Sequence, residues 1–445
     1  MKKPDLPKLL FALSCVLLVF TCGFVVRHYE LFPYSLIAAG AHSVRQVFSE
    51  RETLARIRPK DLTRLDKGTA NGVTVNKAGT EPGFTFMDSF FADGDNEVRL
   101  MRLDGSVVNR WPMRFFKIFP SQAHIDSAFR PQSEWNAQSH GALALPDGSI
   151  VFNFEGMGTA KLDRCGAVVW TVPRMTHHSV EQSQDGGFWI PARNLVRDRS
   201  PFPLMKPIYI SDLILKVSAD GKVVDEISVL DVIFKNGLAA FLFANGLPSV
   251  QLASNQGFDG VDPVHTNDVE ELTSKMAAGF PQFRAGDLLV SLRNLNMIIV
   301  MDPVTRKVKW HQTGPWLKQH DPDFQAHGRI SVFDNNDDGT PTGSILGGSH
   351  IMEVDPATGK TSIRYGGTPE QHWFSHRRGK HQYLANGNVL IADSETGRII
   401  EVTPKGDIVW EYVNRYDDQS VAVVRGATRY PENYFTVKDW KCPVP

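Results

Sequence analysis

The sequence has almost no net charge and very little cysteine. Lysine and arginine total 48 and aspartate and glutamate total 49, so the formal net charge is −1. A nucleic-acid-binding domain is usually distinctly basic, so we expect no nucleic-acid partner. Of the four cysteines, Cys15 and Cys22 lie in an apolar N-terminal run. The other two, Cys165 and Cys442, either form a disulfide that ties the C-terminal tail to an early repeat or remain two free buried thiols.

Close histidine spacings for a metal ion are missing around three acidic residues. No His-x-His or His-x3-His pair accompanies Asp262, Asp268 and Asp321, although scattered histidines can still form a metal site. Residues 334–339 have the first half of a calcium-loop spacing, but Ile345 occupies the position that requires glutamate. This excludes an EF-hand and favours a hairpin turn, with adventitious calcium binding as the alternative. We expect no metal and no other cofactor.

One uncharged apolar run, residues 9–26, differs from the rest of the chain. Its length is near the lower limit for a helix that spans a bilayer. Three lysines precede it and Arg27 follows it, and this bias places the N-terminus in the cytoplasm and the remainder outside. A cleaved signal peptide is the alternative, but no small-residue cleavage motif follows promptly. We predict a single-pass membrane anchor and an extracytoplasmic domain, either periplasmic or extracellular.

From about residue 81 the chain consists of short, often alternating apolar runs separated by turn signals. The strongest turn signals are Asp104-Gly105, Asp147-Gly148, Asp185-Gly186, Asp220-Gly221 and Asn386-Gly387. The pattern recurs about six times, near residues 81–112, 139–172, 177–229, 264–312, 319–366 and 374–413. Repeats of roughly 40 residues that each form a four-stranded sheet are typical of a β-propeller. We therefore predict an all-β fold with a six-bladed β-propeller, and other repeat β-folds are the alternative.

These boundaries divide the chain into four segments. We predict an N-terminal membrane anchor at residues 1–30, a juxtamembrane linker or helix at 31–80, the propeller at 81–430 and a C-terminal tail at 431–445. Residues 230–245 interrupt the strand pattern with a longer apolar stretch. We expect a helical insertion between blades there.

Histidine recurs at a fixed distance before the hairpin turns. Three histidines stand eight positions before a turn glycine, and they are His140, His178 and His320. The spacing is less regular for four others, which are His265, His372, His376 and His381. Equivalent positions of a repeat fold to equivalent places, so we predict imidazoles that converge on one opening. Counting seven positions beyond each turn glycine gives cross-strand partners, which are Glu155 for His140, Arg193 for His178 and Asn335 for His320. The same count from Gly286 gives Arg293.

Such a group suits the transfer of a tetrahedral anionic group. A neutral imidazole can attack the central atom. Arginine and protonated histidine can stabilise anionic oxygens, and another histidine can transfer protons. His140 paired with Glu155 fits a structural role better than a catalytic one, and His327 fits a role in its own turn.

Several short motifs resemble the arylsulfate sulfotransferase family. They are DPVHTNDVEEL at residues 262–272, the strand ending in Ser291-Leu292-Arg293, Trp310 followed by Gln319-His320-Asp321, Phe333-Asp334-Asn335, and residues 382–412. The likeness extends over roughly residues 135–415 and depends on the order and spacing of the motifs. It implies a six-bladed propeller that moves a sulfuryl group from a phenolic sulfate ester to a phenolic acceptor. The implied mechanism passes through a sulfohistidine and uses no nucleotide donor.

The resemblance also implies roles for individual residues. His320 would be the nucleophile, and His265, Asn267 and Arg293 would hold the sulfuryl and phenolic oxygens, with His178 completing the site. Together with the hairpin count, this gives the catalytic set His320, His265, Arg293 and His178 and the substrate-binding set Asn267, Arg193, His376 and Asn335. Two other classes of function stay open. One is a non-catalytic propeller that binds an anionic ligand or a partner protein, and the other is a metal-dependent hydrolase.

Overall fold

The computed structural model describes residues 5–28, 31–32, 59, 61–202, 204–244 and 260–442, and the chain divides into two compact units. In the first unit, α1 (Leu6–His28) is an apolar helix whose segment Leu6–Val26 is long enough to cross a membrane. It is a candidate membrane anchor or signal sequence. Of the juxtamembrane linker or helix predicted at residues 31–80, residues 33–58 and 60 lie outside the described residues.

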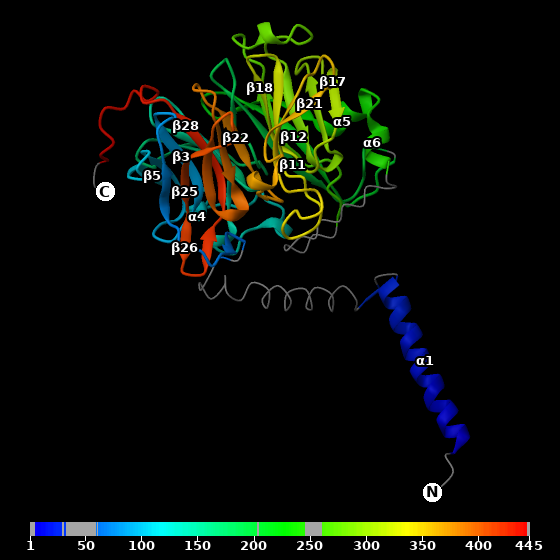
Figure 1. The fold of residues 1–445 in the computed structure, drawn as a ribbon. Helices are drawn as coiled ribbons and strands as arrows, with labels where there is room; N and C mark the ends of the chain where they lie inside the picture. Colours follow the sequence, from blue (N-terminus) through cyan, green and yellow to red (C-terminus); the bar gives the residue numbers. More distant parts are fainter. Residues whose placement is uncertain are drawn as a thin grey trace. The chain divides into compact units, whose positions relative to one another are not determined.

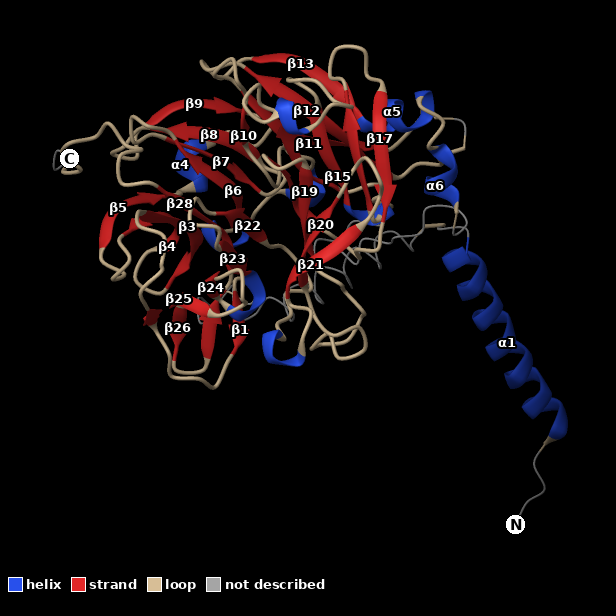
Figure 2. Ribbon diagram, turned by 45° about the horizontal axis from the view of Figure 1, so that its top comes forward, coloured by secondary structure: helices blue, strands red, loops and turns tan. Residues whose placement is uncertain are grey.

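The second unit is built from antiparallel sheets of similar size (Figures 1 and 2). One sheet has the order β28 (Val424–Tyr430), β3 (Phe84–Phe91), β4 (Asp95–Met101) and β5 (Val107–Pro112). The next has β6 (Ser139–Ala144), β7 (Ile150–Phe154), β8 (Gly158–Leu162) and β9 (Val168–Val172). A third has β10 (Glu181–Gln182), β11 (Phe188–Val196), β12 (Tyr209–Val217) and β13 (Val223–Ser228).

Four more sheets complete this unit in the described residues. The first two are β14 (Thr266–Glu271), β15 (Leu288–Leu292), β16 (Met297–Met301) and β17 (Val308–Thr313), then β18 (His320–Gln325), β19 (Arg329–Asp334), β20 (His350–Val354) and β21 (Thr361–Tyr365). A five-stranded sheet has the order β2 (Gly72–Asn76), β25 (Ile408–Val413), β24 (Arg398–Val402), β23 (Val389–Asp393) and β22 (Lys380–Tyr383). A small sheet has β1 (Thr63–Leu65), β27 (Ser420–Ala422) and β26 (Arg415–Asp417). The predicted mostly-β architecture of repeated four-stranded sheets is therefore confirmed.

Two sheets join segments that are far apart in the sequence. β28 pairs with β3, and β2 pairs with β25, so strands from both ends of this unit share sheets. β28 also contacts β6 and β22, and β14 contacts β10 and β18. First strands of neighbouring sheets therefore lie side by side. Residues 63–76, which the sequence assigned to the linker, belong to the folded unit because β1 and β2 pair with C-terminal strands.

The predicted hairpin turns form where the sequence indicates them. Positive φ angles of 79° to 87° occur at the five turn glycines Gly105, Gly148, Gly186, Gly221 and Gly387. Glycine adopts this conformation without a Cβ clash. The Asp-Gly and Asn-Gly pairs thus connect successive strands of one sheet.

Short helices connect the strands. They are α4 (Phe115–Ile118), α5 (Val229–Lys235) and α6 (Ala239–Phe243), with the 3-10 turns η1 (Ser127–Phe129), η2 (Glu134–Asn136), η3 (Ala277–Gly279), η4 (Arg293–Leu295), η5 (Pro369–Gln371) and η6 (Ser394–Thr396). α5 and α6 lie between β13 and β14, where the strand pattern breaks. The Ser228 hydroxyl accepts a hydrogen bond from Asp231 N and caps α5.

A disulfide joins the C-terminal tail to the sheet of β6 to β9. Cys165, which lies between β8 and β9, is bonded to Cys442, and their Cα atoms are 5.5 Å apart. The sequence had left this pairing open. Phe435 and Trp440 pack against the core beside the disulfide, so the tail is held by apolar contacts as well as by the covalent bond.

A Cys165→Ser variant should unfold at a lower temperature than the wild type. Removing a disulfide that spans 277 residues of chain should lower the free energy of unfolding by about 2–5 kcal/mol, because the unfolded chain regains conformational freedom. The measurement is the thermal midpoint of the full chain in detergent. A variant with serine at both Cys15 and Cys22, which are free cysteines in α1, should melt as the wild type does. An unchanged midpoint for Cys165→Ser would contradict a stabilising role of the bridge.

Candidate active site

Four histidines converge where the first strands of neighbouring sheets begin. His140 lies in β6, His178 precedes β10, His265 precedes β14 and His320 opens β18. The ring centroid of His178 lies 4.1 Å from that of His140, 5.0 Å from that of His265 and 6.1 Å from that of His320. The convergence that the repeat predicted is therefore confirmed for these four imidazoles.

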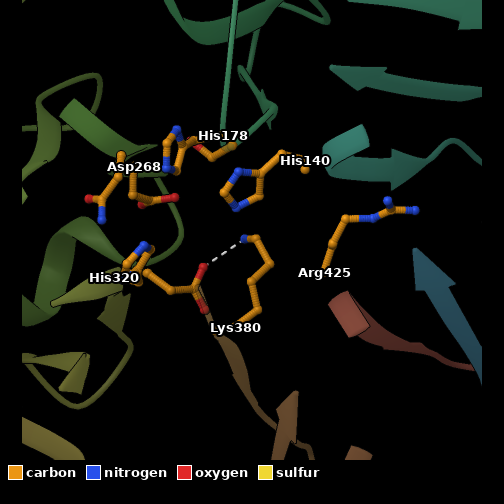
Figure 3. A pocket seen from close by; sticks show the side chains of 11 residues that line it. His140, His178, Asp268, His320, Lys380 and Arg425 are labelled. Carbon is orange, nitrogen blue, oxygen red and sulfur yellow. Dashed lines mark hydrogen bonds and ion pairs between the residues drawn. The ribbon is translucent and has the colours of Figure 1, made fainter. Parts of the chain in front are cut away.

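A cavity lies beside three of these rings, those of His140, His178 and His320 (Figure 3), whereas His265 and Arg293 are not among its lining residues. It is lined by His140, Gly141, His178, Ser179, Asn267, Asp268, His320, Asp321, Gly379, Lys380 and Arg425. The backbone is unusual here, because His178, His265 and Asp321 have positive φ angles of 55°, 56° and 50°. Residues other than glycine disfavour positive φ angles, and such backbone conformations concentrate at functional sites. The surrounding sheets must hold these residues in place.

Hydrogen bonds fix both the orientation and the tautomer of His320. Its Nδ1 lies 2.6 Å from Asn335 Oδ1 and 3.1 Å from Lys318 O. Asn335 Nδ2 donates to the backbone oxygens of Ser375 and Arg378, at 2.6 Å and 2.7 Å, so its oxygen must face the imidazole. Both neighbours of Nδ1 are acceptors, so Nδ1 carries the proton and Nε2 keeps its lone pair.

The imidazole of His320 is neutral at pH 7. Burial, followed by the positive charge of Arg293, holds its pKa well below the ordinary value, although the hydrogen bond that its Nδ1 donates to Asn335 Oδ1 acts in the opposite direction. A neutral imidazole whose lone pair is not used by a hydrogen bond is a competent nucleophile. The predicted pairing of His320 with Asn335 is confirmed, and Asn335 itself is fully buried behind the ring.

Asp262 orients His265 in a similar way. His265 Nδ1 donates to Asp262 Oδ2 at 2.5 Å. Burial alone would raise the Asp262 pKa, but the charge of His265 and this hydrogen bond hold it below the ordinary value. Arg293 N donates to His265 O at 3.1 Å. The backbone therefore places Arg293 directly beside His265.

Glu155 links the other two histidines. Its Oε2 lies 2.8 Å from His140 Nδ1 and 3.6 Å from His178 Nδ1, so the predicted pairing of His140 with Glu155 is confirmed. Arg193 Nη1 lies 3.8 Å from Glu155 Oε1. The predicted cross-strand pairing of His178 with Arg193 is wrong in register, because Arg193 N bonds to Met175 O. An isolated bridge joins Thr176 to Ala192, so Thr176 rather than His178 lies opposite this end of β11.

Two other predicted residues differ in their relation to the cavity. Asn267 is buried and lines it, and its Nδ2 donates to Gln319 O at 2.8 Å. Asn267 Oδ1 has no hydrogen-bond partner within the described residues, so it can still accept or approach a ligand. His376 is not among the lining residues, and its ring stacks on Phe374 with 6.0 Å between centroids.

The sequence did not predict a charged network at the cavity. Lys380 Nζ lies 2.6 Å from Asp321 Oδ1 (Figure 3), and His381 N donates to Asp321 Oδ2 at 2.6 Å. Burial, with repulsion from neighbouring carboxylates, raises the pKa of Asp268 to about 7 and that of Glu181 to about 8. These two carboxyl groups therefore bind a proton at higher pH than ordinary carboxyl groups do.

Two groups of side chains have the composition of a metal site. Their ligand atoms lie within 4.8 Å of one another, and they are His140, Glu155 and His178, and Asp321, Asp323 and His381. In the first group Glu155 already accepts a hydrogen bond from His140, and in the second Asp321 is paired with Lys380. In each group, one carboxylate (Glu155 or Asp321) is thus already paired with another side chain of the protein.

Several solved structures are similar to this chain at low sequence identity. A protein of unknown function from Bacteroides caccae is 12% identical, with 78% of this chain and 98% of that chain covered and a TM-score of 0.46. A streptogramin B lyase is 13% identical, with coverages of 81% and 90% and a TM-score of 0.41. TolB from Acinetobacter baumannii is 12% identical, with coverages of 78% and 66% and a TM-score of 0.41. These similarities are too low to indicate a function.

The comparison with curated proteins gives no match, whereas one protein-family model matches most of the sheet-forming region. The model is described as Arylsulfotransferase (ASST) and matches residues 141–415. This range is more than half of the chain and includes His178, His265, Arg293 and His320. The chain belongs to the arylsulfotransferase (ASST) family.

Proposed function

We propose that this protein transfers a sulfuryl group from a phenolic sulfate ester to a phenolic acceptor through a covalent intermediate on His320. Family membership supports an arylsulfotransferase-like activity. The observation that supports His320 is its tautomer, because Nδ1 donates to Asn335 Oδ1 at 2.6 Å and leaves Nε2 free beside the cavity.

The reaction has two half-reactions. In the first, His320 Nε2 bonds to sulfur while the bond between sulfur and the phenolic oxygen of the donor breaks, and the departing oxygen takes up a proton. In the second, the acceptor oxygen bonds to the same sulfur, the bond to Nε2 breaks and the acceptor gives up its proton. A group that exchanges protons with both phenols balances the cycle.

The proposed roles of the neighbouring residues follow from their positions. The sulfuryl and phenolic oxygens are held by Arg293, His265 and Asn267. His265 also exchanges the proton with the phenols, and its hydrogen bond to Asp262 keeps the imidazole ring in place. His178 completes the site. Asn335 positions His320 instead of contacting substrate. Arg193 and His376 complete the proposed substrate-binding set at its edge.

We also propose how the architecture serves this reaction. The six larger sheets act as propeller blades around the cavity, with α5 and α6 as an insertion between the third and fourth blades. α1 anchors the protein in a membrane, and residues from 59 onward lie outside the cytoplasm. The disulfide between Cys165 and Cys442 supports an oxidising compartment.

The test is acceptor-dependent sulfuryl transfer by the full chain in detergent. Chromogenic aryl sulfates are supplied with and without a panel of simple phenols, and release of the chromogenic phenol is followed. We expect release that requires an acceptor and is matched by formation of the acceptor sulfate ester. Release without any acceptor would indicate a sulfatase instead. Absence of release across the panel would favour a non-catalytic protein that binds an anionic ligand.

A further inference from the structure

Two cationic side chains share one neutral oxygen next to His320. Asn294 Oδ1 accepts a hydrogen bond from Arg293 Nη1 at 3.2 Å and lies 3.5 Å from Lys318 Nζ. Asn294 Nδ2 donates to Asp262 O at 2.8 Å. That bond fixes the orientation of the amide, so its oxygen must be the atom that faces both cations.

Neither cation has a carboxylate partner within the described residues. The other buried cations near the site are neutralised, since Lys380 pairs with Asp321, Arg425 with Asp88 and Arg378 with Glu395. No carboxylate oxygen of the described residues lies within 4.0 Å of the side-chain nitrogens of Arg293 or Lys318. Among the described residues, Arg293 and Lys318 thus differ from Lys380, Arg425 and Arg378 in having no carboxylate partner.

The charges in this region disfavour two neighbouring cations. Burial, followed by the charge of Arg293, lowers the pKa of Lys318. Asp262 and Asp337 oppose this from longer range, and Arg377 adds a further positive charge near Arg293. Like charges that are partly withdrawn from water repel, so an anion that contacts both would relieve the repulsion.

The backbone holds Lys318 close to the nucleophile. Lys318 has a positive φ of 59°, and its N donates to Asn296 Oδ1 at 2.9 Å. Its carbonyl oxygen lies 3.1 Å from His320 Nδ1. The segment that fixes the His320 ring is thus the same segment that presents the Lys318 ammonium group to Arg293.

We propose that Arg293, Asn294 and Lys318 form one anion-binding unit and that Lys318 is a second cation for the transferable sulfuryl group. The ligand class is a tetrahedral sulfur oxyanion, either a sulfate ester or inorganic sulfate. Arg293 and Lys318 donate to different oxygens of this group, and Asn294 keeps the two cations together when the site is empty. This inference rests on the proposed function for the identity of the natural ligand.

The test measures inorganic sulfate binding to the full chain in detergent by calorimetry. Lys318→Gln should weaken sulfate binding about 10- to 100-fold, the effect of losing one charge-assisted hydrogen bond. Lys318→Arg should keep most of the affinity because it restores the donor and the charge. The matched control is Lys222→Gln, which removes an exposed lysine that pairs with Asp220 at 2.7 Å, and it should bind as the wild type does.

Each outcome decides the proposal. Sulfate binding by Lys318→Gln that equals the wild type would overturn it, as would an equal loss in Lys222→Gln, which would show only general screening. Absence of sulfate binding by the wild type would also overturn it. Donor kinetics separate this inference from the proposed function, because Lys318→Gln should raise KM for the aryl sulfate. A wild type that binds sulfate through Lys318 yet transfers nothing would leave the anion site intact and reject the transferase function.

Discussion

Replacing His320 by alanine should abolish sulfuryl transfer, with a fall in kcat/KM of about 10³-fold or more. The wild-type side chain offers Nε2 as the attacking atom because its Nδ1 proton is held by Asn335 and Lys318 O. Alanine supplies no nucleophile, and the proposed intermediate cannot form. The measurement is acceptor-dependent release of a chromogenic phenol at saturating acceptor.

The fold of the His320→Ala variant should survive. The substitution leaves Asn335 Oδ1 without its imidazole partner, which destabilises the protein by about 1–3 kcal/mol. His327→Ala is the control, since His327 lies between β18 and β19, half exposed, with Nε2 3.6 Å from Glu353 Oε1. Transfer at the wild-type rate by His320→Ala would reject His320 as the nucleophile. Equal losses in both variants would indicate general damage.

Replacing Asn335 by aspartate should move the acid limb of the pH–rate profile to higher pH. In the wild type, burial and the Arg293 charge keep the His320 pKa well below 6.5, so the reactive neutral imidazole persists as the pH falls to 6. A carboxylate at position 335 stabilises the imidazolium and raises that pKa. More His320 is then protonated and unreactive at low pH. We expect the ratio of kcat/KM at pH 8 to that at pH 6 to be larger in the variant than in the wild type, because more of its His320 is protonated at pH 6.

Asn336→Asp provides a matched control for this experiment. Asn336 Nδ2 donates to the backbone oxygens of Leu346 and Gly348, at 3.0 Å and 2.7 Å. This is the same pattern of two carbonyl partners that Asn335 has, but Asn336 does not hydrogen-bond to His320. The control should lose comparable stability while keeping the wild-type pH profile. Coincident profiles for Asn335→Asp and the wild type would contradict the positioning role of Asn335.

The parts of the fold that could be predicted are those that depend on residues close together in the sequence. Asp-Gly and Asn-Gly pairs give hairpins because glycine tolerates positive φ, so the strand repeat was readable from residue 81 onward. The pairs His140–Glu155 and His320–Asn335 also followed from counting across a turn. The backbone pairing of His178 with Arg193 did not, because Thr176 forms the bridge to β11 there, opposite Ala192.

Contacts between distant segments could not be predicted in the same way. β1 and β2 are short and half-exposed, and only their pairing with C-terminal strands makes them part of the sheets. The partner of Asp321 is Lys380, which opens β22 and is 59 residues away in the sequence. Such pairs depend on which sheets become neighbours.

A covalent sulfuryl adduct is the most direct test of the account. The full chain is incubated with an aryl sulfate in the absence of acceptor, quenched and mapped by peptide mass spectrometry. The account predicts one sulfuryl group on the peptide that contains His320, its absence from His320→Ala and its loss when a phenol is added. Two results would contradict the account. One is sulfuryl transfer without any adduct, and the other is an adduct on another residue that transfers its sulfuryl group to a phenol.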